Sequence, residues 1–303
     1  MDPLEDVLAL LRTRGHVSSG LTAGGDWAVR FPPPRGVKFN AVERGSCELL
    51  VADEDLRVEL GEGDCFLLTR PLPFVLRGGP DVPPVDASEV FADADDGFAR
   101  TGTGDEVVLI GGGFTFGERA RVLLLDALPA VLHVPASAPQ SETLRWALAQ
   151  IAQELSHRPP AATLVGEHLA VVMLVHALRI HLAQTTRHAP GWLAGLADPI
   201  VGPALSALHA APHRPWTVAE IAEVSGVSRS TLAERFKRSV GLSPLDYLRR
   251  WRIELASHRL RHSTDTLAVI ARSVGYGSES ALSTAFKQVT GVSPRVYRSG
   301  AAA

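Results

Sequence analysis

Cysteine is scarce in this chain of 303 residues, which contains only Cys47 and Cys65. Two cysteines exclude the disulfide framework of a small secreted domain and any cysteine-rich zinc site, and they fit a reducing cytosol. The first ten residues, MDPLEDVLAL, also lack the basic flank of a secretory signal. The sequence therefore predicts a cytoplasmic protein that folds without covalent cross-links.

Long hydrophobic runs are lacking too. The most apolar stretch, residues 169–178, is bounded by Glu167 and Arg179 and interrupted by His176. Because a membrane-spanning helix needs about 20 apolar residues, we expect no contact with a membrane. The chain is about twice the length of a typical ~150-residue domain, which indicates two domains.

The small net charge of −3 hides an uneven division. Residues 199–303 carry 14 basic and 7 acidic residues, a net charge of +7, whereas residues 1–198 carry 16 and 26, a net charge of −10. A basic C-terminal segment on an acidic body is what phosphate binding by one domain alone requires. Chance asymmetry between two solvated surfaces is the alternative.

Short β-prone runs separated by turn residues occupy residues 27–76. They are VRF, KFNAV, CELLV, LRVEL, CFLLT and FVL. Such runs predict a sandwich or small barrel, to which residues 107–110 and 131–134 add two strands. Residues 80–105, rich in Asp, Pro and Gly, are predicted to form a loop. The segment Gly111–Gly113 lacks the Gly-Lys-Ser/Thr of a phosphate loop and is predicted to be a turn.

Two helices are expected next, at residues 141–156 and 163–184. The second is apolar nearly all round, so we expect a helical layer or a dimer interface here. Three histidines lie on it, but no carboxylate completes a metal-ligand spacing, so they are interpreted as packing or surface residues. Residues 188–198, with Pro, Gly and a lone Trp, are predicted to link the two domains.

A repeat dominates the C-terminal third. The segment IAEVSGVSRSTLAERFK from Ile221 matches IARSVGYGSESALSTAFK from Ile270, and GLSPLDY from Gly241 matches GVSPRVY from Gly291. The offset is 49 before the glycine turn and 50 after it, so the second copy carries one extra residue in its turn, where insertion is tolerated best. One such helix pair is a weak signal, but two aligned copies indicate twin helix-turn-helix units.

Local chemistry supports this interpretation. Thr217 and Glu220 form a capping-box pattern, and a glycine in each turn supplies the backbone freedom that steeply crossed helices need. Apolar residues at helical spacing must face inward, which leaves a polar side on each second helix. In the first copy the expected DNA-facing residues are Arg229, Ser230, Ala233, Glu234, Lys237 and Arg238. In the second copy they are Glu279, Ser280, Ser283, Thr284 and Lys287.

A helix over residues 245–260 is expected between the copies, about 24 Å long at 1.5 Å per residue. Such a spacer could hold two reading heads on successive major grooves, about 34 Å apart. A helical repeat used for protein contacts is the alternative, but it leaves the excess of arginine unexplained.

Residues 199–298 resemble the DNA-binding domain of the AraC/XylS family. The motif from Gly275-Tyr276 through Phe286-Lys287 to Ser293-Pro294 and Tyr297-Arg298 carries the resemblance. It implies a DNA-binding transcription regulator that contacts RNA polymerase if it is an activator. It also implies that Ser230, Ala233, Glu234, Ser280 and Thr284 enter the major groove. Ala233 and Glu234 depart from the long polar or basic side chains that relatives often carry there.

Residues 20–135 resemble, more loosely, the cupin-like sensor domain of one branch of that family, through residues 42–68 and 123–134. Catalytic cupins hold a metal with histidines, but Asn40 and Phe74 stand where those are expected, so no metal is predicted. The two residues become candidate contacts of a small-molecule effector instead. Cys47 and Cys65 offer a redox-sensor alternative, although buried, inert thiols are the simpler interpretation.

The predicted architecture is α+β. It comprises a cupin-like β-barrel or sandwich over residues 1–138, a helical dimerisation region over 139–188, and an all-α DNA-binding domain over 189–303. We expect a homodimeric, non-enzymatic regulator that binds double-stranded DNA and needs no cofactor. A cupin oxygenase or isomerase and a helical interaction adaptor are the competing classes. Bound metal and salt-dependent DNA affinity, respectively, discriminate them.

Overall fold

The computed structural model describes residues 2–18, 20–79, 82–92, 94, 98–116, 124–139, 141–184 and 191–300. The chain forms two compact units. The β-rich unit is Leu11–Thr186, and the helical unit combines Met1–Leu10 with Arg187–Ala303. Each is described by itself below.

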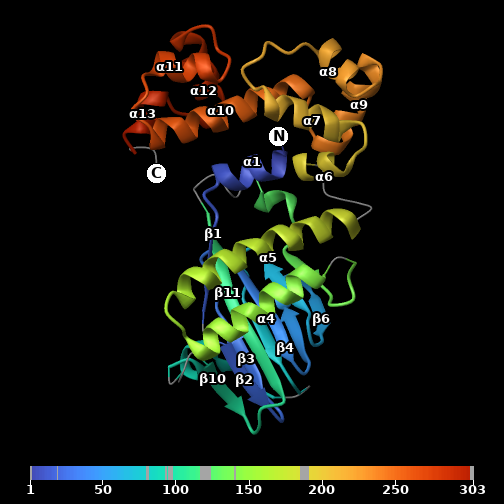
Figure 1. Cartoon of the computed structure of the whole chain (residues 1–303), viewed down its shortest axis with the longest axis vertical. Helices are drawn as coiled ribbons and strands as arrows, with labels where there is room; N and C mark the ends of the chain where they lie inside the picture. The colour runs from blue at the N-terminus through green and yellow to red at the C-terminus, as the bar shows by residue number, and fades with distance from the viewer. Residues whose placement is uncertain are drawn as a thin grey trace. The chain divides into compact units, whose positions relative to one another are not determined.

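The β-rich unit contains two sheets, as the short β-prone runs predicted (Figure 1). The larger sheet has the strand order β10-β2-β11-β4-β7-β12, with β1 also paired to β11. Its strands are β1 (Arg14–Val17), β2 (Gly20–Gly24), β4 (Val37–Arg44), β7 (Cys65–Leu68), β10 (Phe98–Gly102), β11 (Val107–Thr115) and β12 (Val131–Val134). The other sheet, ordered β6-β5-β8-β3-β9, comprises β3 (Ala28–Phe31), β5 (Cys47–Val51), β6 (Leu56–Leu60), β8 (Phe74–Arg77) and β9 (Val85–Asp86).

The core of this unit lies between the two sheets. Alternate residues of each strand point inward, because successive side chains of a strand face opposite sides of the sheet. Leu49 and Leu76 from the smaller sheet share one hydrophobic cluster with Phe66 and Val42 from the larger sheet. All four are at most 2% exposed, so the sandwich is filled at this level.

Two helices pack on the β-rich unit, α4 (Glu142–His157) and α5 (Ala162–Gln184). They lie side by side, and α5 packs against β1 (Figure 1). Within α5, the segment Ala162–Ala183 is long and apolar enough to cross a bilayer by length and composition. The sequence prediction considered only residues 169–178 and missed this. Part of this apolarity is used in packing, since Ala170, Met173 and Ala177 are fully buried.

Two local predictions for the β-rich unit are wrong. The stretch 80–105 is not simply a loop, because its described residues include β9, the short helix α2 (Ala87–Val90) and β10. The Gly111–Gly113 segment is not a turn but the middle of β11. Glycine is needed there because a Cβ on Gly112 would overlap the Phe39 ring and the carbonyl oxygen of His16.

The helical unit begins with α1 (Pro3–Leu10) and resumes in the last third of the chain. Its other helices are α6 (Trp192–Ala197), α7 (Val201–Ala210), α8 (Val218–Val224), α9 (Arg229–Val240), α10 (Pro244–His262), α11 (Leu267–Ser273), α12 (Glu279–Thr290) and α13 (Pro294–Arg298). The described part of the expected linker forms α6, with Trp192 7% exposed, whereas residues 188–190 lie outside the described residues. The first ten residues belong to this unit by their contacts, because α1 packs on α7.

A buried polar network joins α1, α7 and α10. The His209 side chain is 0% exposed and stacks on Trp251, with ring centroids 4.1 Å apart. Its Nδ1 lies 3.3 Å from Asp6 and its Nε2 lies 2.7 Å from the Tyr247 hydroxyl. Burial lowers the pKa of His209 to about 3 and raises the pKa of Tyr247. A neutral imidazole that donates from Nδ1 to Asp6 and accepts from Tyr247 satisfies all three groups.

Replacing Gly112 with alanine should destabilise the β-rich unit by about 1–3 kcal/mol, because the methyl group must displace Phe39 or β1. Urea unfolding measures the change. Gly61→Ala is the matched control, since nothing lies within 4 Å of the Cβ position there. Equal stability of the two variants would contradict the close approach described for β11.

The helical unit should lose stability as the pH falls below ~6.5. Because the folded-state pKa of His209 is lowered from 6.5 to about 3, the unfolded chain takes up a proton first as the pH drops. The contribution of His209 is fully present above ~6.5, and roughly 3 kcal/mol is lost by pH ~4. His209→Gln, which cannot titrate, should flatten this dependence in urea unfolding at a series of pH values. A wild-type profile as flat as that of the variant would refute the buried neutral histidine.

Candidate nucleic-acid interface

The two sequence repeats form the same structure twice. Helix α8 corresponds to α11 at an offset of 49, α9 corresponds to α12 at an offset of 50, and the start of α10 corresponds to the start of α13. Within the helical unit, α10 runs from one pair of helices to the other (Figure 1). The prediction of twin helix-turn-helix units is confirmed by this arrangement.

The turns of the two modules share their backbone geometry. Gly226 and Gly275 adopt φ values of 65° and 85°, a left-handed conformation that favours glycine. One hydrogen bond also recurs, because the N–H groups of Val227 and Tyr276 donate to the carbonyl oxygens of Ala222 and Ala271. The extra residue of the second copy therefore falls immediately after this bond, in the turn itself.

Each second helix has a defined start and end. The hydroxyls of Ser228 and Ser278 accept from backbone N–H groups three residues on, in α9 and α12 respectively. Both helices end at a glycine in the left-handed conformation, Gly241 with φ 81° and Gly291 with φ 82°. These caps set the same length of 12 residues for the two helices.

The buried sides of α9 and α12 fix how each helix is rotated. Phe236 and Phe286 are both 0% exposed and lie 50 positions apart in the chain. Phe236 meets Tyr247 edge-on at 5.8 Å and 65°, and Phe286 meets Tyr297 at 5.3 Å and 72°. Leu232 and Leu282, both 0% exposed, complete the buried sides of α9 and α12. In α12, Ala285 is also buried, whereas Val289 is half-buried.

The opposite sides carry the predicted DNA-facing residues. The exposed ones on the first helix are Arg229, Ser230, Ala233, Glu234, Lys237 and Arg238. The exposed ones on the second are Glu279, Ser280, Thr284 and Lys287, whereas Ser283 is half-buried. Glu234 and Arg238 form a surface ion pair at 3.7 Å, with side chains 79% and 58% exposed. Such a pair contributes little to stability and can open to bind another group.

Sequence reasoning missed the residue that anchors α9. Asp198 accepts hydrogen bonds from the N–H groups of Ile200 and Val201, from Arg235 at 2.9 Å and from the hydroxyl of Ser239. Burial alone would raise the pKa of Asp198, but these donors lower it below its ordinary value. The Asp198-Pro199 pair ahead of an apolar run was an available cue, because Asp and Pro favour helix starts.

Several arginines counted in the basic excess stabilise the fold instead. Arg252 donates to the carbonyl oxygens of Pro212, Arg214 and Gly275. The Arg261 guanidinium lies over the Tyr297 ring at 4.5 Å. The number of basic side chains available to contact phosphates is therefore smaller than the total number of basic residues in this unit.

Comparison with known proteins agrees with this geometry. The sequence matches the family described as cupin over residues 2–183 and that described as helix-turn-helix domain over residues 221–300. An AraC-like transcription regulator from Streptomyces lividans is 62% identical over 298 residues, 98% of either chain. One from Streptomyces antibioticus is 59% identical over 298 residues, again 98% of either chain. The chain belongs to the AraC-like transcription regulators.

A solved structure is also similar to the helical unit of this AraC-like regulator. It is the DNA-binding domain of AdpA in complex with a target DNA, 28% identical, with a TM-score of 0.32, covering 34% of this chain and 92% of that one. In this regulator the helical unit is the helix-turn-helix DNA-binding domain, and double-stranded DNA is its partner. The β-rich unit is its cupin domain.

The candidate effector residues of the cupin domain lie on facing sheets. Asn40 on β4 is 5% exposed and Phe74 on β8 is 2% exposed. Phe74 stacks on Phe31 at 4.7 Å and meets Phe66 edge-on at 5.9 Å, so its ring is part of the packed core. No group of three or more potential metal ligands occurs among the described residues.

Cys47 and Cys65 lie in different sheets and are both buried. Burial, reinforced by the charge of Asp64, raises the pKa of each thiol to about 12. Because the thiolate is the reactive form, neither residue is activated for oxidation in this conformation.

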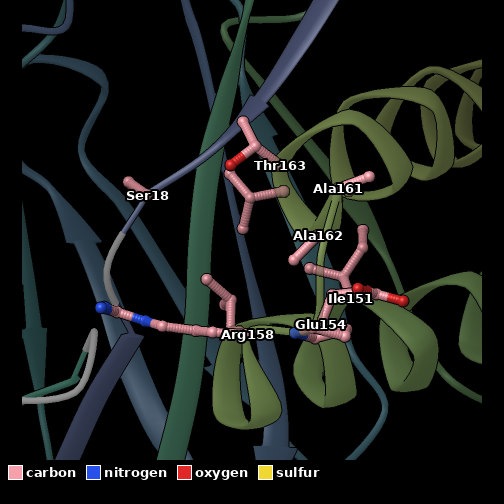
Figure 2. Close-up of a pocket in the computed structure, with 11 residues that line it drawn as sticks. Ser18, Ile151, Glu154, Arg158, Ala161, Ala162 and Thr163 are labelled. Atoms are coloured by element: carbon pink, nitrogen blue, oxygen red, sulfur yellow. The ribbon is translucent and has the colours of Figure 1, made fainter.

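A hollow of about 590 Å³ lies between the end of β1 and the α4–α5 connection (Figure 2). Ser18, Ile151, Ala162 and Thr163 line it, together with Arg158 and Glu154. Its volume falls within the range typical of small-molecule sites. Sequence reasoning did not find it, because it forms only where a strand end meets two helices.

Removing the charge of Arg235 should lower the stability of the protein, whereas removing the charge of Arg238 should weaken DNA binding. Arg235→Met breaks the bond to the Asp198 carboxylate, whose side chain is only 11% exposed, and should cost about 1–3 kcal/mol of stability. Arg238→Met removes an exposed charge and should change stability by less than about 0.5 kcal/mol while weakening DNA binding. Urea unfolding and fluorescence anisotropy with labelled duplex measure the two effects. Similar stability losses in both variants would contradict the anchoring role of Asp198.

Proposed function

We propose that this regulator reads an asymmetric DNA site by placing α9 and α12 in successive major grooves. The observation that carries the proposal is the pair of equivalent helices whose apolar sides are buried and whose polar sides are exposed. The contacting residues are Arg229, Ser230, Ala233, Glu234, Lys237 and Arg238 of α9. Those of α12 are Glu279, Ser280, Ser283, Thr284 and Lys287.

The connecting helix supports the spacing that this mode requires. Helix α10 has 19 residues, about 28 Å at 1.5 Å per residue. A spacer of this length is of the same order as the separation of about 34 Å between successive major grooves on one face of DNA.

The chemistry of the exposed residues suggests a division of labour. Lys237 and Lys287 occupy matching positions and supply point charges suited to phosphates. Ser280 and Thr284 can donate to or accept from base edges, whereas the Ala233 methyl group suits the methyl group of thymine. Glu234 can accept from a cytosine amine once its ion pair with Arg238 opens.

For the cupin domain we propose sensing of a small-molecule effector rather than catalysis. The hollow of Figure 2 offers space for such a molecule. Buried thiols with raised pKa values favour this mode over redox sensing by Cys47 and Cys65. If the regulator is an activator, RNA polymerase is a further partner in the cytoplasm.

Dimerisation through α4 and α5 is also proposed. Apolar side chains stay exposed on these helices although the rest of each helix packs on the sandwich. They are Trp146 at 55%, Leu164 at 56%, Val165 at 41% and Val172 at 37%. A second copy of the chain would cover them, which explains the high apolarity of α5 without a membrane.

DNA affinity should fall steeply with salt, and two substitutions on α9 should separate charge from sequence reading. Lys237→Ala should weaken binding similarly for all sequences and reduce the slope of log affinity against log salt by about one. Glu234→Ala should leave that slope unchanged and relax the preference at one base pair. Anisotropy titrations at several salt concentrations provide the slopes.

Selection of bound sequences from a random duplex pool tests the proposed function as a whole and identifies the operator. Two conserved blocks about one helical turn apart are expected. A single block would remove one module from DNA reading, and salt-independent or absent binding would favour an interaction adaptor. Stoichiometric metal in the purified protein would favour the enzyme instead.

A further inference from the structure

The two glycine turns of the helical unit share a backbone conformation but differ in their surroundings. Gly226 in the first turn and Gly275 in the second adopt φ values of 65° and 85°. A Cβ added at Gly226 would have no atom of the described residues within 4 Å. A Cβ added at Gly275 would lie 2.6 Å from the His213 carbonyl oxygen and 2.8 Å from the His213 Cα. Only the second of these turns is therefore in close contact with a distant part of the chain.

The neighbour of the second turn belongs to the first module. His213 lies in the α7–α8 connection, residues 211–217, which leads into the first helix-turn-helix. The two modules therefore meet directly at this point, in addition to being joined through α10. Because the Cβ would overlap backbone rather than the end of a movable side chain, this close approach needs glycine at position 275.

The α7–α8 connection has internal bonds that fix its shape. The indole N–H of Trp216 donates to the Ala211 carbonyl oxygen at 2.9 Å, and the backbone N–H of Arg214 donates to the same oxygen at 3.1 Å. The Arg214 guanidinium lies over the Trp216 ring at 4.3 Å and pairs at 2.7 Å with Glu220 of the α8 capping box. The second turn thus contacts a segment that is itself tied to the start of α8.

Arg252 of α10 joins the same two segments by hydrogen bonds. Its Nε donates to the Pro212 carbonyl oxygen at 2.6 Å, and its Nη2 donates to that of Arg214 at 2.7 Å. Its Nη1 donates to the Gly275 carbonyl oxygen at 3.4 Å, and its guanidinium carbon lies 5.8 Å from the centroid of the Tyr276 ring. One planar group therefore bonds the α7–α8 connection and the second turn at once. We call this contact between the modules, formed by residues 212–214, Arg252 and Gly275, the module junction.

Arginine suits the module junction better than lysine does. A guanidinium carries five N–H donors in one fixed plane, whereas a lysine ammonium is a point charge with three. Each of the three nitrogens of Arg252 has a carbonyl oxygen as a partner, and burial lowers the pKa of the group. Its donors are thus directed at the protein backbone rather than at a phosphate.

We infer that Arg252 and Gly275 hold the two helix-turn-helix modules in one relative orientation and thereby set the operator spacing that the protein accepts. The inference rests on the proposed reading of DNA by both α9 and α12. A single helix can curve or bend, so α10 alone leaves the modules free to move relative to each other. The module junction adds a second connection that opposes this movement. Arg252 is a positioning residue, which acts on DNA binding through α9 and α12.

Modules held in this way fit one spacing of the two DNA blocks. Each added base pair moves the second block by about 3.4 Å and turns it by about 35° around the duplex. Modules with a fixed orientation then lose the base contacts of one block. Modules joined only by a flexible link would follow the second block and keep the contacts of both.

Spin labels on α9 and α12 test the module junction without DNA. Ser230→Cys and Ser280→Cys place one exposed thiol at matching positions of the two helices, whereas Cys47 and Cys65 are buried and do not compete for the label. Double electron–electron resonance on the full-length protein, diluted with unlabelled protein, should give one narrow distance distribution. Arg252→Met should broaden it, and Arg252→Lys should do so less. Arg250→Met removes an exposed arginine from the same helix and should leave the distribution unchanged.

A matched pair of glycine variants separates the contact between the modules from backbone strain. Gly226→Ala and Gly275→Ala both force alanine into the left-handed conformation, so strain should lower the urea midpoint in both variants. Only Gly275→Ala also pushes against His213, so its midpoint should be the lower of the two. The distance between the labels on α9 and α12 should change in Gly275→Ala alone.

DNA of altered spacing tests the consequence for recognition. The duplex selected from the random pool is compared with one that has an extra base pair between its two blocks. The insertion should weaken binding by the wild type about tenfold or more, because one block loses its base contacts. For Arg252→Met the insertion should weaken binding by about threefold or less, while affinity for a duplex with a single block stays within about twofold of the wild type.

The combined results show which inference fails. A label distance that is unchanged in both Arg252→Met and Gly275→Ala overturns the module junction, and so does one that changes equally in the two glycine variants. In either case two blocks in the selected DNA would leave the proposed reading mode standing. If Arg252→Met broadens the distribution but the wild type binds both spacings equally, the junction holds the modules and reading by two helices is refuted.

Discussion

The burial of one phenylalanine in each of α9 and α12 is the constraint on which the proposed interface depends. Phe236 and Phe286 insert edge-on against a tyrosine of the following helix, and each contact sets the rotation of its helix about its own axis. Since a helix turns 100° per residue, fixing one side also fixes the other. The polar side chains face solvent as a consequence of this packing, before any DNA is present.

Much of this arrangement could be predicted from the sequence, because it depends on local signals. The repeat offset of 49 and then 50 residues, the serine caps and the turn glycines are all visible in the chain. These signals predicted the twin modules and nearly every residue on the exposed sides of α9 and α12. The strands of the cupin domain were found for the same reason, since each has its own alternating pattern.

The errors and omissions concern contacts between distant segments. The Gly111–Gly113 segment reads as a turn until strands β1 and β4 are placed on either side of it. Residues 1–10 pack on α7, some 200 positions away, through a histidine that shows no local pattern. Arg252 reads as one more basic residue of α10 until the α7–α8 connection and the second turn are placed beside it. Non-local pairing of this kind leaves no periodicity in the sequence.

The uninterrupted course of α10 has a further consequence for how this regulator can evolve. A one-residue insertion in that helix would rotate the second helix-turn-helix module relative to the first by about 100° and displace it by about 1.5 Å. In the proposed mode of DNA reading, insertions and deletions in α10 are therefore expected to abolish operator recognition, whereas substitutions on α9 and α12 can change the bases that are contacted. The lineage can change which bases it reads far more easily than the distance between them.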